Sequence, residues 1–187
     1  MGKLHMTITA KRWGFSALAG IAALGVAAAA TPAKAEISAD TPGAQKAVDL
    51  MKMWVNAGAP NGAFTYKDLS GNDAKGSFDA DIMPLFTTNA IWGDDTLACT
   101  SCHMGNTEES LHEMDLTSYE GMMKGGDVLS SPPGVPLFGQ SKVGATDYKW
   151  DNSKMRHRLR DNRMPPGIEF DITEENRDGP IVLHGSN

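Results

Sequence analysis

The sequence predicts an all-α fold with an N-terminal helical extension and long loops. Three observations favour it. Four segments have helical features, Gly- and Pro-rich stretches separate them, and about 150 residues remain once an N-terminal leader is set aside, which is the size of one domain. The four segments are residues 44–57, 78–88, 116–124 and 152–161.

The first 35 residues have the features of an export signal. A basic start precedes an apolar run at residues 15–30, and small residues at Ala33 and Ala35 form a cleavage site. The apolar run is shorter than the ~20 residues that a bilayer span needs. We therefore expect cleavage after Ala35 and a periplasmic protein without a membrane span, with a retained membrane anchor as the alternative.

Removing the leader makes the chain strongly acidic. Four of the 17 Lys and Arg residues lie in residues 1–35, which hold no Asp or Glu, so 13 basic residues remain against 23 acidic ones. The formal net charge of the remaining chain is then −10. This balance argues against nucleic acid and anionic lipid as partners.

The first helical segment belongs to the expected N-terminal extension. Val48, Met51 and Val55 lie on one helical face, and Gly58 ends the segment. Residues 63–77 are rich in Gly, Asp, Lys and Ser and predict a loop or linker. The expected parts of the chain are a signal peptide at 1–35, an extension of helix plus linker at 36–77, and the main domain at 78–187.

The other three segments carry their own start and stop signals. Pro84 suits the first turn of a helix in the second segment. Thr117 or Ser118 is the candidate cap of the third, and Gly125 is its stop. Apolar residues four positions apart indicate a helix in the fourth.

Cys99-Thr-Ser-Cys102-His103 is the motif with the most specific chemistry. Cys99 and Cys102 are the only cysteines in the chain, and the spacing is that of c-type haem attachment. The two thiols can form thioethers with the vinyl groups on one edge of a haem, and the adjacent histidine becomes the proximal iron ligand. We therefore predict one covalently bound haem c.

Other interpretations of the cysteine pair fit the sequence less well. A zinc site needs about four protein ligands, and the chain has no second cysteine pair. A thioredoxin-like redox disulfide belongs in a βαβ setting, which the flanking sequence lacks.

A six-coordinate electron-transfer haem needs a second axial ligand opposite His103. Met164 is the favoured candidate because the Pro-Pro-Gly sequence that follows it stiffens the backbone and leaves the side chain free to project. His157 and an open site are the alternatives. Other methionines lie on expected helices, where they suit core packing: Met51, Met122 and Met155.

A basic cluster adjoins Met164 in this acidic chain. It is either a solvated helix face, a partner for the haem propionates, or a patch that steers an acidic partner to the haem edge. Its members are Lys154, Arg156, Arg158, Arg160 and Arg163.

Three stretches together resemble the class I monohaem cytochromes c: residues 99–103, 134–139 (GVPLFG) and 163–167 (RMPPG). The resemblance covers about residues 78–187. It implies the cytochrome c fold, a small helical bundle wrapped around the haem. It also implies that Met164 is the distal ligand and that the carbonyl of Pro136 accepts a hydrogen bond from the Nδ1–H of His103.

Residues 48–61 resemble the closing helix of some bacterial cytochromes of this kind. We therefore expect the N-terminal helix to dock on the haem domain and to extend its packing.

The function predicted from these features is periplasmic transport of single electrons between redox protein partners, a donor and an acceptor, without enzyme activity. One alternative is a tightly bound cytochrome subunit of a periplasmic dehydrogenase or of a membrane respiratory or photosynthetic complex, which the extension and the long 104–135 insertion favour. Another is a haem enzyme or gas sensor with a labile distal site.

Overall fold

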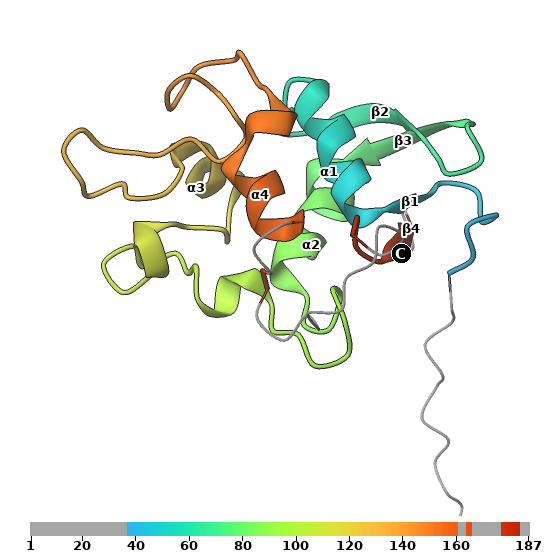
Figure 1. The fold of residues 1–187 in the computed structure, drawn as a ribbon, viewed down its shortest axis with the longest axis horizontal. Coiled ribbons are helices and arrows are strands. Elements are labelled where there is room, and N and C mark those ends of the chain that lie inside the picture. The colour runs from blue at the N-terminus through green and yellow to red at the C-terminus, as the bar shows by residue number, and fades with distance from the viewer. Residues whose placement is uncertain (1–36, 161–163, 166–176, 184–187) are drawn as a thin grey trace, which may run out of the picture. The chain divides into compact units, whose positions relative to one another are not determined.

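The structure is a computed structural model that describes residues 37–160, 164–165 and 177–183 (Figure 1). The predicted export signal lies outside the described residues. The chain divides between Lys34 and Ala35, and the fold described below belongs to the part that begins at Ala35. None of the helices in the described ranges is long and apolar enough to cross a membrane.

The described part of the chain is mixed α/β, so the prediction of an all-α fold is wrong. It contains four α-helices and two separate antiparallel sheets of two strands each. In chain order these are β1 (Ala44–Lys46), α1 (Ala47–Asn56), β2 (Ala63–Lys67), β3 (Asp73–Ser77), α2 (Pro84–Thr87), α3 (Tyr119–Lys124), α4 (Lys154–Arg160) and β4 (Ile181–Leu183). Short π or 3-10 turns lie at η1 (Phe78–Ile82), η2 (Cys99–Ser101), η3 (Leu111–Glu113) and η4 (Trp150–Asn152).

Strands β2 and β3 form a hairpin where the sequence predicted a loop. Phe64 and Tyr66 are buried while the residues on either side of each are exposed, which is the alternation of a half-buried strand. The register places Ala63 opposite Ser77. A Cβ on Gly76 would come within 2.6 Å of the Phe64 ring, so only glycine leaves room for it. Burial of two aromatic rings beside α1 therefore outweighs the poor strand propensity of the hairpin's polar residues.

The second sheet pairs strands from distant parts of the chain, β1 and β4. The segment that leads into β4 also satisfies the first N–H groups of α1. The N–H of Ala47 donates to the carbonyl of Pro180 at 2.9 Å, and that of Val48 donates to the carbonyl of Asp178 at 3.0 Å. Backbone groups from residues 177–183 thus replace the side-chain cap that α1 lacks.

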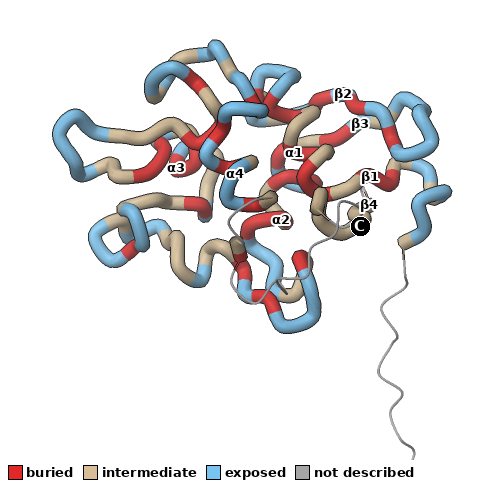
Figure 2. Tube along the Cα trace, viewed as in Figure 1, coloured by how far each residue is buried: buried red, intermediate tan, exposed pale blue. Residues whose placement is uncertain are grey.

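Helix α1 lies at the centre of the hydrophobic core, where the buried stretches meet in Figure 2. The Trp54 ring lies 5.6 Å from that of Phe78 and 5.1 Å from that of Phe138, and its Nε1–H donates to the carbonyl of Pro60 at 2.9 Å. The N-terminal helix therefore docks on the rest of the protein, as predicted, and the expected extension and main domain share one core. Its buried residues are Ala47, Val48, Leu50, Met51, Trp54 and Val55.

The remaining helices agree with the sequence signals. Pro84 is in the first turn of α2, Ser118 caps α3, and Gly125 ends it with a positive φ of 80°. Helix α4 buries Met155 and Leu159. These helices are short, and loops connect them through the region that carries the predicted site.

Candidate haem-attachment site

Cys99, Cys102 and His103 lie on a single turn of chain at η2. The carbonyl of Cys99 accepts the N–H of Cys102 at 3.1 Å and the N–H of His103 at 2.9 Å. Both thiols are free and half-buried. One turn therefore brings together the two thiols and the imidazole that haem attachment requires.

The chain before this turn is anchored to α2, which η2 contacts. The N–H of Ala98 donates to Oδ1 of Asn89 at 2.8 Å, and the buried Nε1–H of Trp92 donates to the carbonyl of Leu85 at 2.7 Å. Cys99 itself packs against the edge of the core. The backbone that leads into the first attachment thiol is thus held against the core and the α2 segment.

Residues 104–116 return to the motif and hold His103 through hydrogen bonds. Its Nδ1 lies 2.9 Å from the carbonyl oxygen of Leu111. The N–H of Leu111 donates to the carbonyl of Cys102 at 3.0 Å, and the N–H of Leu116 donates to the carbonyl of His103 at 3.1 Å. An Nδ1–H that donates to a carbonyl leaves Nε2 as the free ligand atom, which suits a proximal iron ligand.

The acceptor for His103 is thus the carbonyl of Leu111, where the family resemblance predicted that of Pro136. Pro136 is half-buried between Val135, whose backbone pairs with Gly126, and the buried Leu137. The long segment after the motif explains the difference. It returns at once to His103 and supplies an acceptor eight residues along the chain.

Burial changes the proton affinities of this turn. It lowers the pKa of His103, although the hydrogen bond to Leu111 acts in the opposite direction. It raises the pKa of the Cys99 thiol to about 11. A neutral imidazole suits metal ligation, and the raised pKa of Cys99 disfavours the thiolate that disulfide exchange needs.

Two large apolar side chains are exposed beside the turn. Leu97, just before Cys99, is 55% exposed, and Leu111, whose backbone holds the motif, is 56% exposed. A flat apolar group bound here can remove such surface from water. The thiols, the oriented imidazole and these leucines together fit a covalently attached haem.

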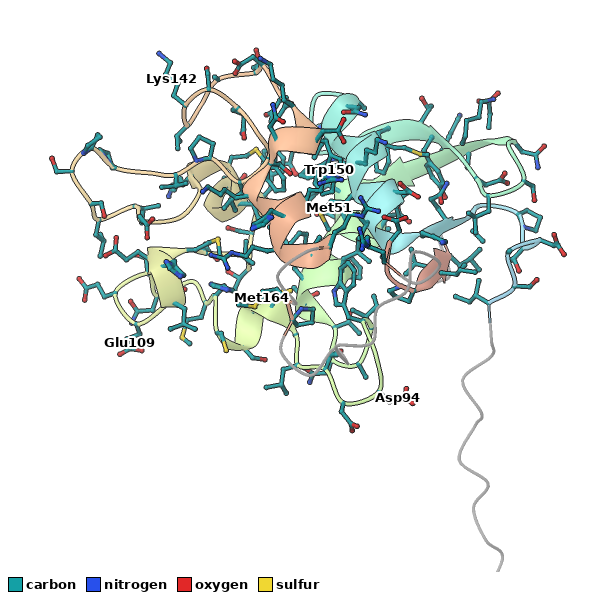
Figure 3. The ribbon with its side chains drawn as sticks, in the orientation of Figure 1. Met51, Asp94, Glu109, Lys142, Trp150 and Met164 are labelled. Carbon is teal, nitrogen blue, oxygen red and sulfur yellow. The ribbon has the colours of Figure 1, made fainter. Side chains whose placement is uncertain are left out.

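Met164 is half-buried just beyond the end of α4 (Figure 3). Its N–H donates to the carbonyl of Arg158 at 3.1 Å, which ties this residue to the last turn of the helix. Its role as the distal ligand stays a prediction. The methionines expected to pack in the core, Met51, Met122 and Met155, are buried there.

The basic cluster of α4 is partly engaged in ion pairs. Nε of Arg156 lies 3.7 Å from Oδ1 of Asp151, and Nε of Arg160 lies 2.8 Å from Oδ1 of Asp178. His157, the other candidate distal ligand, is exposed on this helix. Arg163 lies outside the described residues.

Sequence reasoning missed two residues that shape the site. Leu111 acts through its backbone carbonyl, which any residue type provides, so no signal could have identified it. Asp115 had a readable signal, because an aspartate before Thr117 and Ser118 favours an Asx turn. Its carboxylate accepts the Thr117 N–H at 2.7 Å and the hydroxyls of Thr117 and Ser118 at 2.6 and 3.1 Å.

No protein-family model and no curated protein matches this chain. The resemblance to the class I cytochromes c therefore rests on the three sequence motifs. Within residues 37–160, 164–165 and 177–183, no three His, Cys, Asp or Glu side chains come together as a metal site. A haem site differs from such a cluster, because the porphyrin surrounds the iron and the protein supplies axial ligands.

Proposed function

We propose that this protein is a periplasmic c-type cytochrome that carries single electrons through one haem c, ligated by His103 and Met164. The observation that supports this most strongly is the turn at η2. It brings Cys99, Cys102 and His103 together, with Nδ1 of the imidazole committed to the carbonyl of Leu111. The periplasmic location rests on the export signal predicted in residues 1–35.

Each residue of the site has a separate task in this proposal. Cys99 and Cys102 fix the group covalently, so that it stays bound in both oxidation states. His103 ligates the iron, and the hydrogen bond to Leu111 orients the ring and raises its basicity as a ligand. The haem, when bound, supplies reversible one-electron chemistry. Its donor and acceptor would be redox proteins.

The first test asks whether the chain carries covalent haem. We expect the full chain, produced in a host that attaches c-type haem, to show peroxidase-active colour on a denaturing gel and a mass larger by one haem. Cys99→Ala combined with Cys102→Ala should abolish both signals. Thr100→Ala and Ser101→Ala, at the two positions between the cysteines, are matched controls that should retain them. A colourless wild-type protein would contradict the proposal.

The second test identifies the distal ligand. Ferric haem bound by methionine has a weak far-red absorption band, and a thioether ligand raises the reduction potential. Met164→Ala should abolish the band and lower the potential, while Met114→Ala should change neither. Loss of the band in Met114→Ala with retention in Met164→Ala would show that the ligand assignment is wrong. Carbon monoxide binding by the reduced wild-type protein would instead favour a haem enzyme or gas sensor.

A further inference from the structure

Arg160, the last residue of α4, forms a close ion pair with Asp178. The two atoms, Nε and Oδ1, are 2.8 Å apart, and the side chains are only 19% and 23% exposed. The pair between Lys67 and Asp73 on the hairpin has the same length, but its side chains are 59% and 84% exposed. Screening by water leaves such an exposed pair with almost no contribution to stability. Removing one partner of a buried pair is destabilising, because it leaves an uncompensated buried charge.

Asp178 is held firmly by the rest of the fold. Its carbonyl accepts a hydrogen bond from the N–H of Val48, in the first turn of α1. The strand that follows it, β4, pairs with β1. The next residue, Gly179, has φ +77° and lies so close to Trp92 that a Cβ would come within 2.7 Å of the indole ring. Trp92 belongs to the segment that leads into Cys99. The Asp178 segment thus contacts both α1 and the chain before the attachment turn.

The other end of this connection is Met164. Its N–H bond to the carbonyl of Arg158 anchors it to the same last turn of α4 that Arg160 occupies. A continuous set of contacts therefore runs from the chain before Cys99, through Trp92 and Asp178, to Arg160 and the methionine. It joins the two parts of the chain that supply the two predicted axial ligands.

We infer that the Arg160–Asp178 ion pair is a latch that holds Met164 in place as the sixth ligand of the haem. Arg160 and Asp178 are positioning residues, because they act on the iron only through Met164. The inference rests on the proposed function, in which Met164 is that ligand. It goes beyond that proposal by assigning control of the methionine–iron bond to a pair of charged residues, one from α4 and one from the segment before β4.

The charges near Asp178 indicate that Arg160 is needed as a positive charge at this place. Asp49, in the first turn of α1, is near Asp178: burial first, and then the charge of Asp178, raise the pKa of Asp49. Arg160 acts in the opposite direction on that carboxyl, as do Lys46 and Lys52. Arg160 therefore pairs with Asp178 and also favours the charged form of Asp49, so its removal takes away a positive charge that acts on both carboxylates.

The experiment measures how readily an added ligand replaces Met164. Imidazole can bind ferric haem only in molecules in which the methionine has left the iron, so its apparent affinity reports that fraction. In the full-length haem protein, Arg160→Gln should tighten imidazole binding about tenfold, a typical loss for a partly buried pair. It should also weaken the far-red band. Asp178→Asn should have the same effect and serves as the test if Arg160→Gln fails to fold.

Controls separate the latch from general stability and from the ligand assignment. Lys67→Gln removes the same charge from the exposed pair of equal length and should leave imidazole affinity unchanged. The double variant Arg160→Gln/Asp178→Asn should bind imidazole no more tightly than either single variant, because both changes remove the same ion pair. A lower melting temperature with unchanged imidazole affinity would overturn the latch. Retention of the far-red band in Met164→Ala would overturn the proposed ligand, and the latch with it.

Discussion

Helix α1 and the attachment turn are stabilised in different ways. Helix α1 buries a nearly complete apolar face, and Trp54 at its centre packs against two other aromatic rings. The turn at Cys99 and the loop that returns to it are held mainly by backbone hydrogen bonds, and Leu97 and Leu111 beside them remain exposed. The first region has its own core, whereas the second is the region where we propose that a haem binds.

The difference teaches where the predicted haem contributes to stability. A region with buried side chains resists unfolding through its own packing, whereas one with exposed apolar groups and few buried contacts opens at lower free energy. We therefore expect the haem to stabilise residues 99–116 strongly and α1 weakly. The following predictions test that contrast, from the largest expected effect to the smallest.

Trp54→Ala should destabilise the whole protein. The change removes the ring that joins Phe78 and Phe138 and should cost about 3–5 kcal/mol of unfolding free energy. Chemical denaturation followed by circular dichroism measures it. Asn56→Ala, at an exposed position on the same helix, should stay within about 0.5 kcal/mol of the wild type. Equal losses of unfolding free energy in the two variants would show that the buried face of α1 contributes no more to stability than its exposed face.

The double variant Cys99→Ala/Cys102→Ala should loosen the attachment region selectively. Without covalent haem, amide hydrogen exchange at residues 104–116 should speed up about 100-fold, equivalent to about 2.7 kcal/mol of local opening. Exchange within α1 should change far less. The measurement is hydrogen exchange with peptide-level mass spectrometry. Uniform acceleration across both regions would remove the contrast between them.

Gly125→Ala should disturb the loop that follows α3. Gly125 has φ +80°, and a Cβ there would overlap the carbonyl oxygen of Val135, so we expect a loss of about 1–3 kcal/mol. Gly144 has φ +79°, but a Cβ there would meet no atom within 4 Å, so Gly144→Ala isolates the cost of the backbone conformation alone. Thermal unfolding should rank Gly125→Ala as the more damaging change.

Asp115→Asn should give the smallest effect, about 1 kcal/mol at neutral pH. Burial alone would raise the pKa of Asp115, but hydrogen bonds from Thr117 and Ser118 outweigh it and the pKa is lowered below 3.8. A lowered folded-state pKa adds stability above the ordinary value, and this stability is lost as the pH falls through the folded pKa. Urea midpoints of variant and wild type should therefore converge below about pH 4; a constant gap would contradict this.

The sequence predicted those parts of the fold in which local pattern and tertiary packing agree. The apolar face of α1, the Ser118 cap and the stop at Gly125 are all set within a few residues, and the structure confirms them. The hairpin at β2 and β3 was missed because its composition resembles a loop, although Phe64 and Tyr66 carried the alternation of a strand.

Other features depend on contacts that no local pattern encodes. Strand β4 exists because it pairs with β1, far away in the chain. The spacing of Cys99, Cys102 and His103 identified the candidate turn, and the structure places the three together. The acceptor for the imidazole could not be predicted, because the fold of the intervening loop decides which carbonyl reaches His103.

The pairing of β1 with β4 has a consequence for synthesis of the protein. A nascent chain cannot close this sheet, or supply the backbone acceptors at the start of α1, until residues 177–183 have been made. By then the cysteine turn has already emerged, so its thiols would be accessible to an enzyme that attaches the proposed haem. Late closure would thus leave time for the proposed haem to be attached before β1 and β4 pair.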